Sequence, residues 1–342
     1  MGSRRGHVDD NESNAKRGFT IVELLIVVVV IAVLAAITIV AYSGITNQAK
    51  ASAKAQDIAQ WKKKSELRKV EKGISCPEGY VFIYGNSALG TNDFCVMKYE
   101  AKNIGGVATS QADGTPWVSI TQTDAIAAAT ASGGHLITEA EWMTIAADVL
   151  SVKYNWSGGA VGSGYVYQGH VNNNPGSALA ASADDSDGLF GITGGTGTTV
   201  GRNSQRTLLL SSGDTIWDFS GNVYEWTQQA IGTPTLTTSQ IGVSGDSNWI
   251  WREWNLGSLS MGNLGSNSRP SALTSTAGLS DIASWDASKG IGRVYANYAD
   301  ASARAFRRGG SWGNTSDAGV LALALDTSAT NAGTAVGFRV AR

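Results

Sequence analysis

The chain has 342 residues, a formal net charge of −2 and only 16% charged residues. This composition lacks the basic footprint of a nucleic-acid-binding protein, so we expect no nucleic-acid partner. The length allows a long helix plus one or two domains. A zinc site would need partners beyond Cys76 and Cys95, and only His135 and His170 remain after residue 18. A disulfide is therefore favoured if the chain is exported.

An apolar segment follows a hydrophilic start of 18 residues. It runs from Phe19 to Ala41 and contains only three polar side chains: Thr20, Glu23 and Thr38. As a helix it is long enough to cross a hydrocarbon core of about 30 Å. No apolar run precedes Gly18, so a cut at that residue retains the segment as an anchor. The carboxylate of Glu23 is costly inside a membrane, which marks it as functional.

The residues after Ala41 continue with helical periodicity and many lysines, without proline before Pro77. A single helix from Phe19 to Lys72 would be roughly 80 Å long. We therefore expect four parts: a cleaved leader (1–18), a membrane or fibre-core helix (19–41), a helical stem (42–73) and a head domain (74–342).

The string Gly18-Phe19-Thr20-x-x-Glu23 and its apolar run resemble the class III signal of type IV pilins and pseudopilins. The resemblance implies cleavage after Gly18 by a prepilin peptidase and N-methylation of Phe19. It also implies that Glu23 pairs with the amino group of Phe19 in a neighbouring subunit, so that each buried charge has a partner. The alternative is a plain single-span anchor that contains a chance glutamate. The sequence departs from many pilins because it lacks a helix-kinking proline near Val40.

The pilin resemblance has consequences for partners and location. The implied partners are other pilin subunits, in a homo- or hetero-polymer, and the assembly machinery of a type IV pilus or a type II secretion system. The implied location is the cytoplasmic membrane before assembly and an extracellular pilus or the cell surface afterwards.

The head domain begins with two predicted strands, Tyr80–Tyr84 and Phe94–Tyr99, separated by turn residues. A Cys76–Cys95 bridge would tie the domain's start to its second strand and contribute about 3 kcal/mol. Two free buried thiols are the alternative, which is less common outside the cytoplasm.

Two helices and long loops follow. One helix is predicted at Ala125–Ala131, and a second at Trp142–Leu150, where Thr138 and Glu141 have capping-box spacing. The later residues are rich in Gly, Ser and Asn, with scattered aromatic residues such as those of Trp249–Trp254. We expect those tryptophans to fill the core.

Four strings in the head resemble the formylglycine-generating-enzyme/sulfatase-modifying family: Leu136–Trp142, Ile216–Thr227, Arg307–Trp312 and Gly337–Arg342. The resemblance covers about residues 76–342. It implies an α+β fold in which a long N-terminal helix is followed by a loop-rich C-type-lectin-like domain.

The family's enzymes oxidise a sulfatase cysteine with two copper-binding cysteines that follow the Arg-Gly-Gly-Ser-Trp string. Here Gly313 and Asn314 follow it, and there is no cysteine after Cys95. Neither residue can replace a thiolate nucleophile and soft copper ligand. We therefore expect a protein that is not an enzyme and requires no cofactor.

Family enzymes also carry a structural calcium site, which matches Asp218, Glu225 and the carbonyls of Gly221 and Val223. Hard oxygen ligands suit Ca²⁺. The alternative, equally favoured, is an acid pair hydrogen-bonded to the loop backbone.

Residues 313–336 resemble the variable region of proteins diversified by retroelements, which use the same fold and end in a Gly-Phe-Arg-x-Ala-Arg string. Mutation at the adenines of AAC codons yields the small and polar residue types that occur here. The resemblance implies that these side chains gather on an exposed ligand-binding face: Gly313, Asn314, Asp317, Ala324, Asp326, Thr327, Asn331, Gly333 and Ala335. The interleaved apolar residues are expected to be buried: Val320, Leu321, Leu323, Leu325 and Val336. An ordinary surface loop is the alternative.

Taken together, the sequence predicts a pilus or pseudopilus subunit that displays a lectin-like domain for adhesion or recognition of a protein or glycan. A purely structural pilin without a dedicated ligand is the second interpretation. An oxidase is the third, and the missing cysteines disfavour it.

Overall fold

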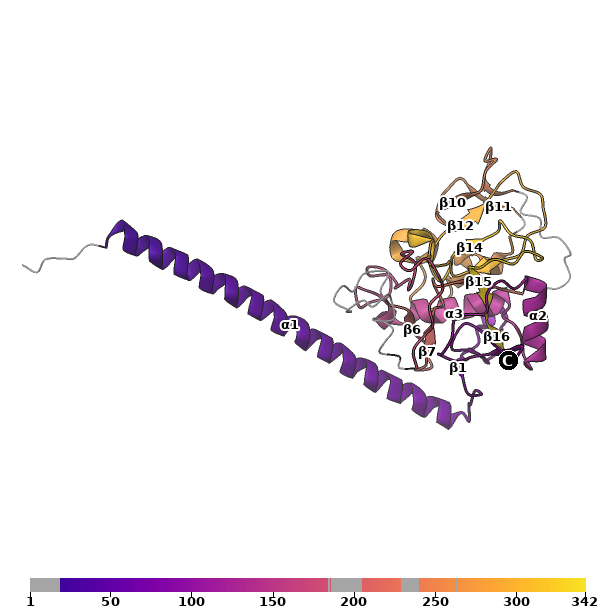
Figure 1. Cartoon of the computed structure of the whole chain (residues 1–342), viewed down its shortest axis with the longest axis horizontal. Helices are drawn as coiled ribbons and strands as arrows, with labels where there is room; N and C mark the ends of the chain where they lie inside the picture. Colours follow the sequence, from indigo (N-terminus) through magenta and orange to yellow (C-terminus); the bar gives the residue numbers. More distant parts are fainter. Residues whose placement is uncertain (1–18, 184, 186–204, 229–239, 263) are drawn as a thin grey trace, which may run out of the picture. The chain divides into compact units, whose positions relative to one another are not determined.

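The computed structural model describes residues 19–183, 185, 205–228, 240–262 and 264–342. The cleaved leader and Gly18, predicted above, lie outside these ranges. The chain divides into two compact units, Met1–Ala59 and Gln60–Arg342, and each is described by itself. The predicted fold class, a long N-terminal helix followed by a loop-rich α+β domain, is confirmed (Figure 1).

The first unit is built on helix α1, Ile21–Glu71, whose last turns belong to the second unit. The segment Ile21–Ile39 has a mean hydropathy of 3.1 and is long and apolar enough to cross a membrane. Its side chains are exposed along the whole segment. Exposed apolar surface of this extent is unfavourable in water. The predicted single helix from Phe19 to Lys72 is present as Ile21–Glu71, within two residues at each end, while its division into a membrane or fibre-core part and a stem stays a prediction.

The end of α1 packs against the head domain inside the second unit. The Trp61 ring lies edge-on to Tyr154, with centroids 5.7 Å apart, and Lys69 forms an ion pair of 2.7 Å with Asp214. Gly213, at φ +88°, allows this approach, because an added Cβ would lie 2.9 Å from the Cβ of Ser65. The compact unit that contains the head begins at Gln60 and so includes the last turns of α1, while the boundary at residue 74 stays a prediction.

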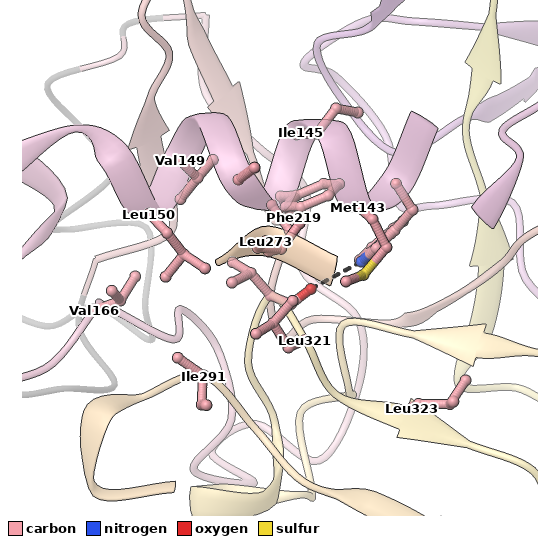
Figure 2. Close-up of a cluster of buried hydrophobic side chains, with 14 of the residues drawn as sticks. Met143, Ile145, Val149, Leu150, Val166, Phe219, Leu273, Ile291, Leu321 and Leu323 are labelled. Carbon is pink, nitrogen blue, oxygen red and sulfur yellow. Dashed lines mark hydrogen bonds between the residues drawn. The ribbon is translucent and has the colours of Figure 1, made fainter. Parts of the chain in front are cut away.

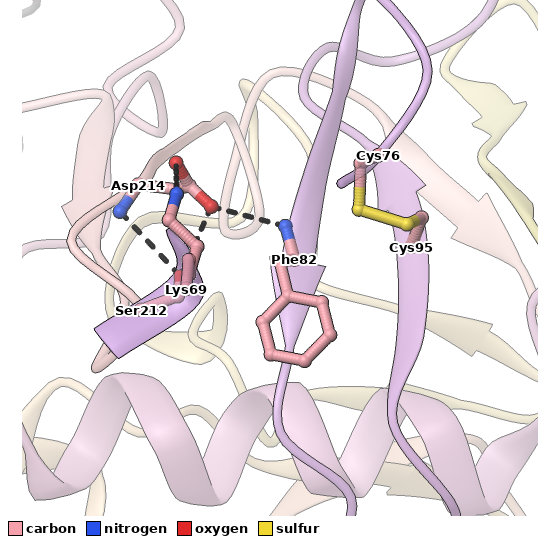
Figure 3. The surroundings of a disulfide bond; sticks show 6 residues. All are labelled: Lys69, Cys76, Phe82, Cys95, Ser212 and Asp214. Atoms are coloured by element: carbon pink, nitrogen blue, oxygen red, sulfur yellow. Dashed lines mark hydrogen bonds and ion pairs between the residues drawn. A yellow bond between two sulfur atoms is a disulfide. The ribbon is translucent and has the colours of Figure 1, made fainter. Parts of the chain in front are cut away.

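A disulfide between Cys76 and Cys95 ties the segment before the first strand of the head to its second strand (Figure 3). The cysteines' Cα atoms are 5.7 Å apart, within the range that a disulfide spans. Beside it, Asp214 accepts hydrogen bonds from Lys69 and from the backbone N–H of Phe82, at 2.7 and 3.1 Å. The predicted bridge is present. The contacts of Asp214 with Lys69 and Phe82 hold the end of α1 beside it, and we call them the clamp.

Four strands form the sheet that holds the disulfide, in the order β1-β2-β16-β5. The C-terminal strand lies in its middle, so the two ends of the head domain pair with each other. These strands are β1 (Tyr80–Ile83), β2 (Phe94–Met97), β16 (Val340–Ala341) and β5 (His135–Leu136).

The two predicted helices are confirmed as α2 (Gln122–Ala131) and α3 (Glu139–Ser151). Thr121 caps α2 by accepting from the backbone N–H of Asp124 at 3.0 Å. The reciprocal capping box of Thr138 and Glu141 is present at the start of α3. These caps satisfy backbone donors that the first helical turn leaves free.

A six-stranded sheet runs through the later half of the domain in the order β10-β12-β14-β13-β8-β15. It mixes parallel and antiparallel pairs. Its strands are β10 (Ile250–Arg252), β12 (Val294–Ala296), β14 (Leu323–Ala324), β13 (Arg307–Arg308), β8 (Tyr224–Trp226) and β15 (Val336–Phe338).

Three two-stranded sheets are also present in the described part of the head. Their pairs are β3 (Lys102–Ile104) with β4 (Val107–Thr109), β6 (Thr207–Leu209) with β7 (Thr215–Trp217), and β9 (Ile241–Val243) with β11 (Leu259–Met261).

The main core lies between α3 and the later loops and strands (Figure 2). Trp142 of α3 stacks on Phe219 with centroids 4.0 Å apart, and its indole N–H donates to the Val320 carbonyl at 2.8 Å. The apolar residues predicted to be buried between positions 320 and 336 are all at most 2% exposed. Those residues hold the predicted variable region against the core.

Candidate functional site

The two faces of the six-stranded sheet carry different chemistry, because successive side chains of a strand point to opposite sides. In β13, Arg308 points to the inner face and Arg307 to the outer face. In β8, Glu225 is on the inner face, and Tyr224 is on the outer one. Arg308 and Glu225 are at most 1% exposed.

Buried arginine–carboxylate pairs occupy the inner face. Arg308 donates to Glu139 at 2.6 Å, and Arg339 donates to Glu225 at 2.8 Å. Burial raises the pKa of the Glu139 carboxyl, but the charge and hydrogen bonds of Arg308 outweigh that effect, so its pKa is lowered. Removing one partner would leave an uncompensated charge in the core.

A second group of charges surrounds Asp218, which accepts two hydrogen bonds of 2.7 Å from Arg206. Glu100 accepts a hydrogen bond from the side-chain amide of Asn222 at 2.5 Å, and Lys102 is 2% exposed. Burial, followed by the negative charge of Asp218, raises the pKa of Glu100 well above its ordinary value. Burial also lowers the pKa of Lys102.

Both carboxylates of the predicted calcium site already have cationic partners. The carboxylates of Asp218 and Glu225 are each held by an arginine, and a divalent ion would have to displace or neighbour those cations. Within the described ranges, no group of three or more His, Cys, Asp or Glu side chains is arranged to hold a metal ion. The calcium site, with its carbonyls of Gly221 and Val223, stays an untested prediction that this geometry does not favour.

The outer face centres on Tyr224 and Arg307. The Arg307 guanidinium lies over the Tyr224 ring, 4.6 Å from its centroid, and pairs with Asp326. The pKa of the Tyr224 hydroxyl is raised, because the effect of burial outweighs the charge of Arg307 and a hydrogen bond from Asn314, which lower it. Asp317 lies nearby and pairs with Arg293 at 2.7 Å.

Three of the predicted variable residues, Asn314, Asp317 and Asp326, therefore gather around one arginine and one tyrosine. We call the set Tyr224, Arg307, Asn314, Asp317 and Asp326 the outer face. Asn314 is fixed there, because its side-chain oxygen accepts from the backbone and hydroxyl of Ser311 at 2.7 and 2.8 Å. These side chains are half-buried, except for the more deeply buried Tyr224.

The other predicted variable residues differ in their exposure. Gly313 and Asn331 are exposed, and Gly333 and Ala335 are half-buried in the loop before β15. The prediction of an exposed side chain is wrong for Ala324 and Thr327, which are 0% and 9% exposed. Ala324 lies in β14, in the middle of the sheet, where Tyr295 and Arg307 flank it on the neighbouring strands.

The sequence argument missed Arg307 and Tyr224 as members of this face and placed the tryptophans of 249–254 in the core. Trp254 is buried as expected, at 6% exposure, but Trp249 and Trp251 are only half-buried. The Trp-Ile-Trp alternation was the available signal, since it places both rings on one side of a strand.

At the start of α1, the Glu23 carboxylate is engaged within its own chain. It accepts from the Thr20 N–H at 2.9 Å and from the Thr20 hydroxyl at 2.8 Å. Phe19, the predicted methylated residue, is 80% exposed. Glu23 thus caps its own helix, and its pairing with Phe19 of a neighbour stays a prediction.

Comparison with known proteins gives two family matches. The prokaryotic N-terminal methylation motif matches residues 13–39, which include Gly18, Phe19 and Glu23. The sulfatase-modifying factor enzyme 1-like domain matches residues 79–342. No curated protein matches the chain.

Solved structures similar to the chain include two Major Tropism Determinant variants. The I1 variant is 16% identical, with 78% of this chain and 52% of that chain covered and a TM-score of 0.32. The U1 variant is 15% identical, with the same coverage and a TM-score of 0.31. The chain thus spans about half the length of these structures, and likeness at this level carries no argument about the ligand.

The domain match covers more than half of the chain and contains all four strings that suggested it. A pilin-like N-terminal motif therefore precedes a head domain, and the chain belongs to the sulfatase-modifying factor enzyme 1-like domain family.

Proposed function

We propose that this protein is a type IV pilus or pseudopilus subunit whose head domain binds a ligand at the cell surface, for adhesion or recognition. The proposal is supported by the presence of two parts in one chain. The first is the N-terminal methylation motif, and the second is a family domain that has no cysteine after Cys95. The first part supplies export and assembly. The second supplies a rigid scaffold without the catalytic thiols of the family's enzymes.

The cysteine chemistry supports a binding role over an oxidase. The protein's two cysteines are joined in the Cys76–Cys95 disulfide. Asn314, soon after the Arg-Gly-Gly-Ser-Trp string, is hydrogen-bonded to Ser311 and is neither a nucleophile nor a soft metal ligand.

The arrangement of residues 313–336 supports diversification by a retroelement. Buried apolar side chains alternate with side chains of the outer face, so replacement of the latter leaves most core contacts intact. Ala324 and Thr327 are exceptions. A near-copy of this DNA beside a reverse-transcriptase gene is the expected genomic signature, and its absence from the complete genome would contradict diversification.

Assembly is tested by three substitutions in the N-terminal helix. Glu23→Gln keeps an oxygen that can cap Thr20 but removes the charge, and Glu23→Ala removes both. Thr38→Ala is the matched control, because the Thr38 hydroxyl donates to its own helix at the Leu34 carbonyl, 2.8 Å away. We expect both Glu23 variants to reach the membrane but to be missing from sheared fibres, whereas Thr38→Ala assembles. Normal assembly of Glu23→Gln would show that charge pairing is not required.

Ligand binding is tested with the full chain in detergent and with cells that bear the fibres. Asp326→Ala and Asn331→Ala change side chains of the predicted variable region, and Asp113→Ala changes an exposed carboxylate elsewhere in the head. We expect the first two to weaken attachment to target cells and the third to leave it unchanged. Equal attachment by all three would favour a purely structural subunit.

A further inference from the structure

Half-buried aromatic side chains extend the outer face across the six-stranded sheet, beyond residues 313–336. Trp251 of β10 lies directly across from Tyr295 of β12, with ring centroids 4.9 Å apart and planes at 29°. Trp249, two residues earlier, has its ring centroid 5.8 Å from that of Tyr295. We call these three residues the aromatic row. All three residues are half-buried, and each packs on one side against a cluster of buried hydrophobic residues.

The aromatic row is continuous with the outer face. Tyr295 pairs across strands with Ala324, which in turn pairs with Arg307. The Arg304 guanidinium lies over the Trp249 ring, 5.1 Å from its centroid, and donates to the Asp326 carbonyl at 3.0 Å. Asp326 therefore links an arginine of the outer face with an arginine that covers the aromatic row.

The charges on this surface are paired with one another. Arg304 pairs with Asp300 at 2.5 Å, and Arg307 pairs with Asp326. Because the pairs cancel, the surface offers no net charge that would select an anionic ligand. Carboxylate acceptors and guanidinium donors instead lie beside aromatic rings. The Nε–H groups of Arg304 and Arg307 have no acceptor among the described residues.

This combination fits a neutral sugar better than a protein partner. A pyranose presents C–H groups that pack on an aromatic ring and hydroxyls that both donate and accept hydrogen bonds. Protein interfaces also use Trp, Tyr and Arg, but they commonly add a contiguous exposed apolar patch. The large apolar side chains exposed in the described part of the head beyond α1 are Ile104, Val107 and Leu256, and none belongs to the six-stranded sheet.

We propose that the aromatic row is a glycan-binding subsite for a neutral pyranose, adjoining the outer face. The proposal rests on the proposed function and assigns a ligand class to it. Because its residues lie outside 313–336, the aromatic row supplies constant affinity for sugar rings, and the side chains at 314, 317 and 326 select among them.

The experiment uses the full chain in detergent on immobilised neutral oligosaccharides of glucose, galactose and mannose. Trp251→Ala removes the ring, and Trp251→Leu removes it while it keeps apolar volume against Tyr295. Trp251→Phe retains an aromatic ring. Tyr165→Ala is the matched control, since Tyr165 is another half-buried ring, 6.0 Å from Tyr167 and outside the sheet.

We expect retention on at least one neutral glycan, weakened about tenfold or more by Trp251→Ala and Trp251→Leu, which corresponds to about 1.4 kcal/mol. Trp251→Phe and Tyr165→Ala should bind within about threefold of the original chain. Retention on none of the neutral glycans would overturn the proposal. Unchanged retention of a folded Trp251→Leu protein would overturn it as well.

Attachment to target cells separates this proposal from the function on which it rests. If Asp326→Ala abolishes attachment and Trp251→Leu does not, the glycan subsite is wrong and the proposed function stands. If protease treatment of the target cells abolishes attachment and deglycosylation does not, the ligand is a protein and the subsite is again wrong. If neither substitution weakens attachment, the proposed function itself fails.

Discussion

Arg307 and Arg308 are neighbours in one strand, yet they serve opposite faces of the six-stranded sheet. Arg308 is 0% exposed and pairs with Glu139, while the side chain of Arg307 is 11% exposed and pairs with Asp326, which is 31% exposed. The same chemical pair is thus a core component on one face and a surface component on the other. The inner pairs hold the loops together, and the outer pair is free to change with the ligand.

The largest effect is expected when an inner pair is broken. Arg308→Met should destabilise the head by about 3–5 kcal/mol, because it leaves the Glu139 carboxylate buried without its cation. Thermal or denaturant unfolding of the full chain in detergent measures the loss. Arg307→Met is the matched control and should cost less than Arg308→Met, because the partner left behind, Asp326, is 31% exposed and can be hydrated. Equal losses of stability for the two variants would contradict the expected difference between the inner and the outer arginine pairs.

The pH dependence of stability sharpens the contrast between two buried acids, Asp148 and Glu139. Burial raises the pKa of Asp148 from 3.8 to about 6, against the hydrogen bonds from Ser211. Its folded form binds the proton more tightly, so the stability that this provides is present below about pH 4 and is lost as the pH rises through 6. Glu139, with its lowered pKa, contributes the opposite slope.

Asp148→Asn should therefore raise the free energy of unfolding at pH 8 by at most about 3 kcal/mol and flatten its change between pH 4 and 7. Asp113→Asn, at an exposed carboxylate, is the control and should leave the profile unchanged. Unfolding measured at several pH values tests this. If the free energy of unfolding of Asp148→Asn changes with pH as steeply as that of the original chain, another group causes the pH dependence.

An intermediate effect is expected at Ala324, which is buried and belongs to the outer side of the sheet. Ala324→Leu should cost about 1–3 kcal/mol, because the added carbons displace the Tyr295 ring or the Arg307–Asp326 pair. Ala324→Ser adds one atom and should cost less. Unfolding measurements on both variants test whether this position tolerates diversification.

The smallest change in stability is expected at Asp326. Asp326→Asn should alter the free energy of unfolding by less than about 1 kcal/mol, because the pair is partly exposed. Its effect should appear in ligand attachment instead. A stability loss as large as that of Arg308→Met would show that the outer face is also part of the core.

Local sequence signals predicted the helices and their caps well. The capping box of Thr138 and Glu141 depends on residues three apart, so the sequence contains all the information that it needs. The family strings likewise pointed to the head domain before its geometry was known. Buried apolar residues between positions 320 and 336 followed from hydrophobicity alone.

Partners distant in sequence could not be predicted in this way. The Arg339–Glu225 pair joins residues 114 positions apart, and Arg308–Glu139 joins residues 169 apart. The burial of Ala324 depends on Tyr295 and Arg307, whose side chains flank it only after the sheet has formed. The sequence therefore predicted the variable positions of the candidate site. Its arginine and aromatic members could be identified only from the folded structure.

The contact of Asp214 with both Lys69 and the Phe82 backbone has a mechanical consequence. It bridges the end of α1 and the first strand of the head, so it bypasses the short connection between Glu71 and Tyr80. A pull on the head would reach the helix through the covalent chain, through this clamp and through the Trp61–Tyr154 contact. The head is thus held to the helix end at several points, and tension on a bound ligand would not be carried by the connecting loop alone.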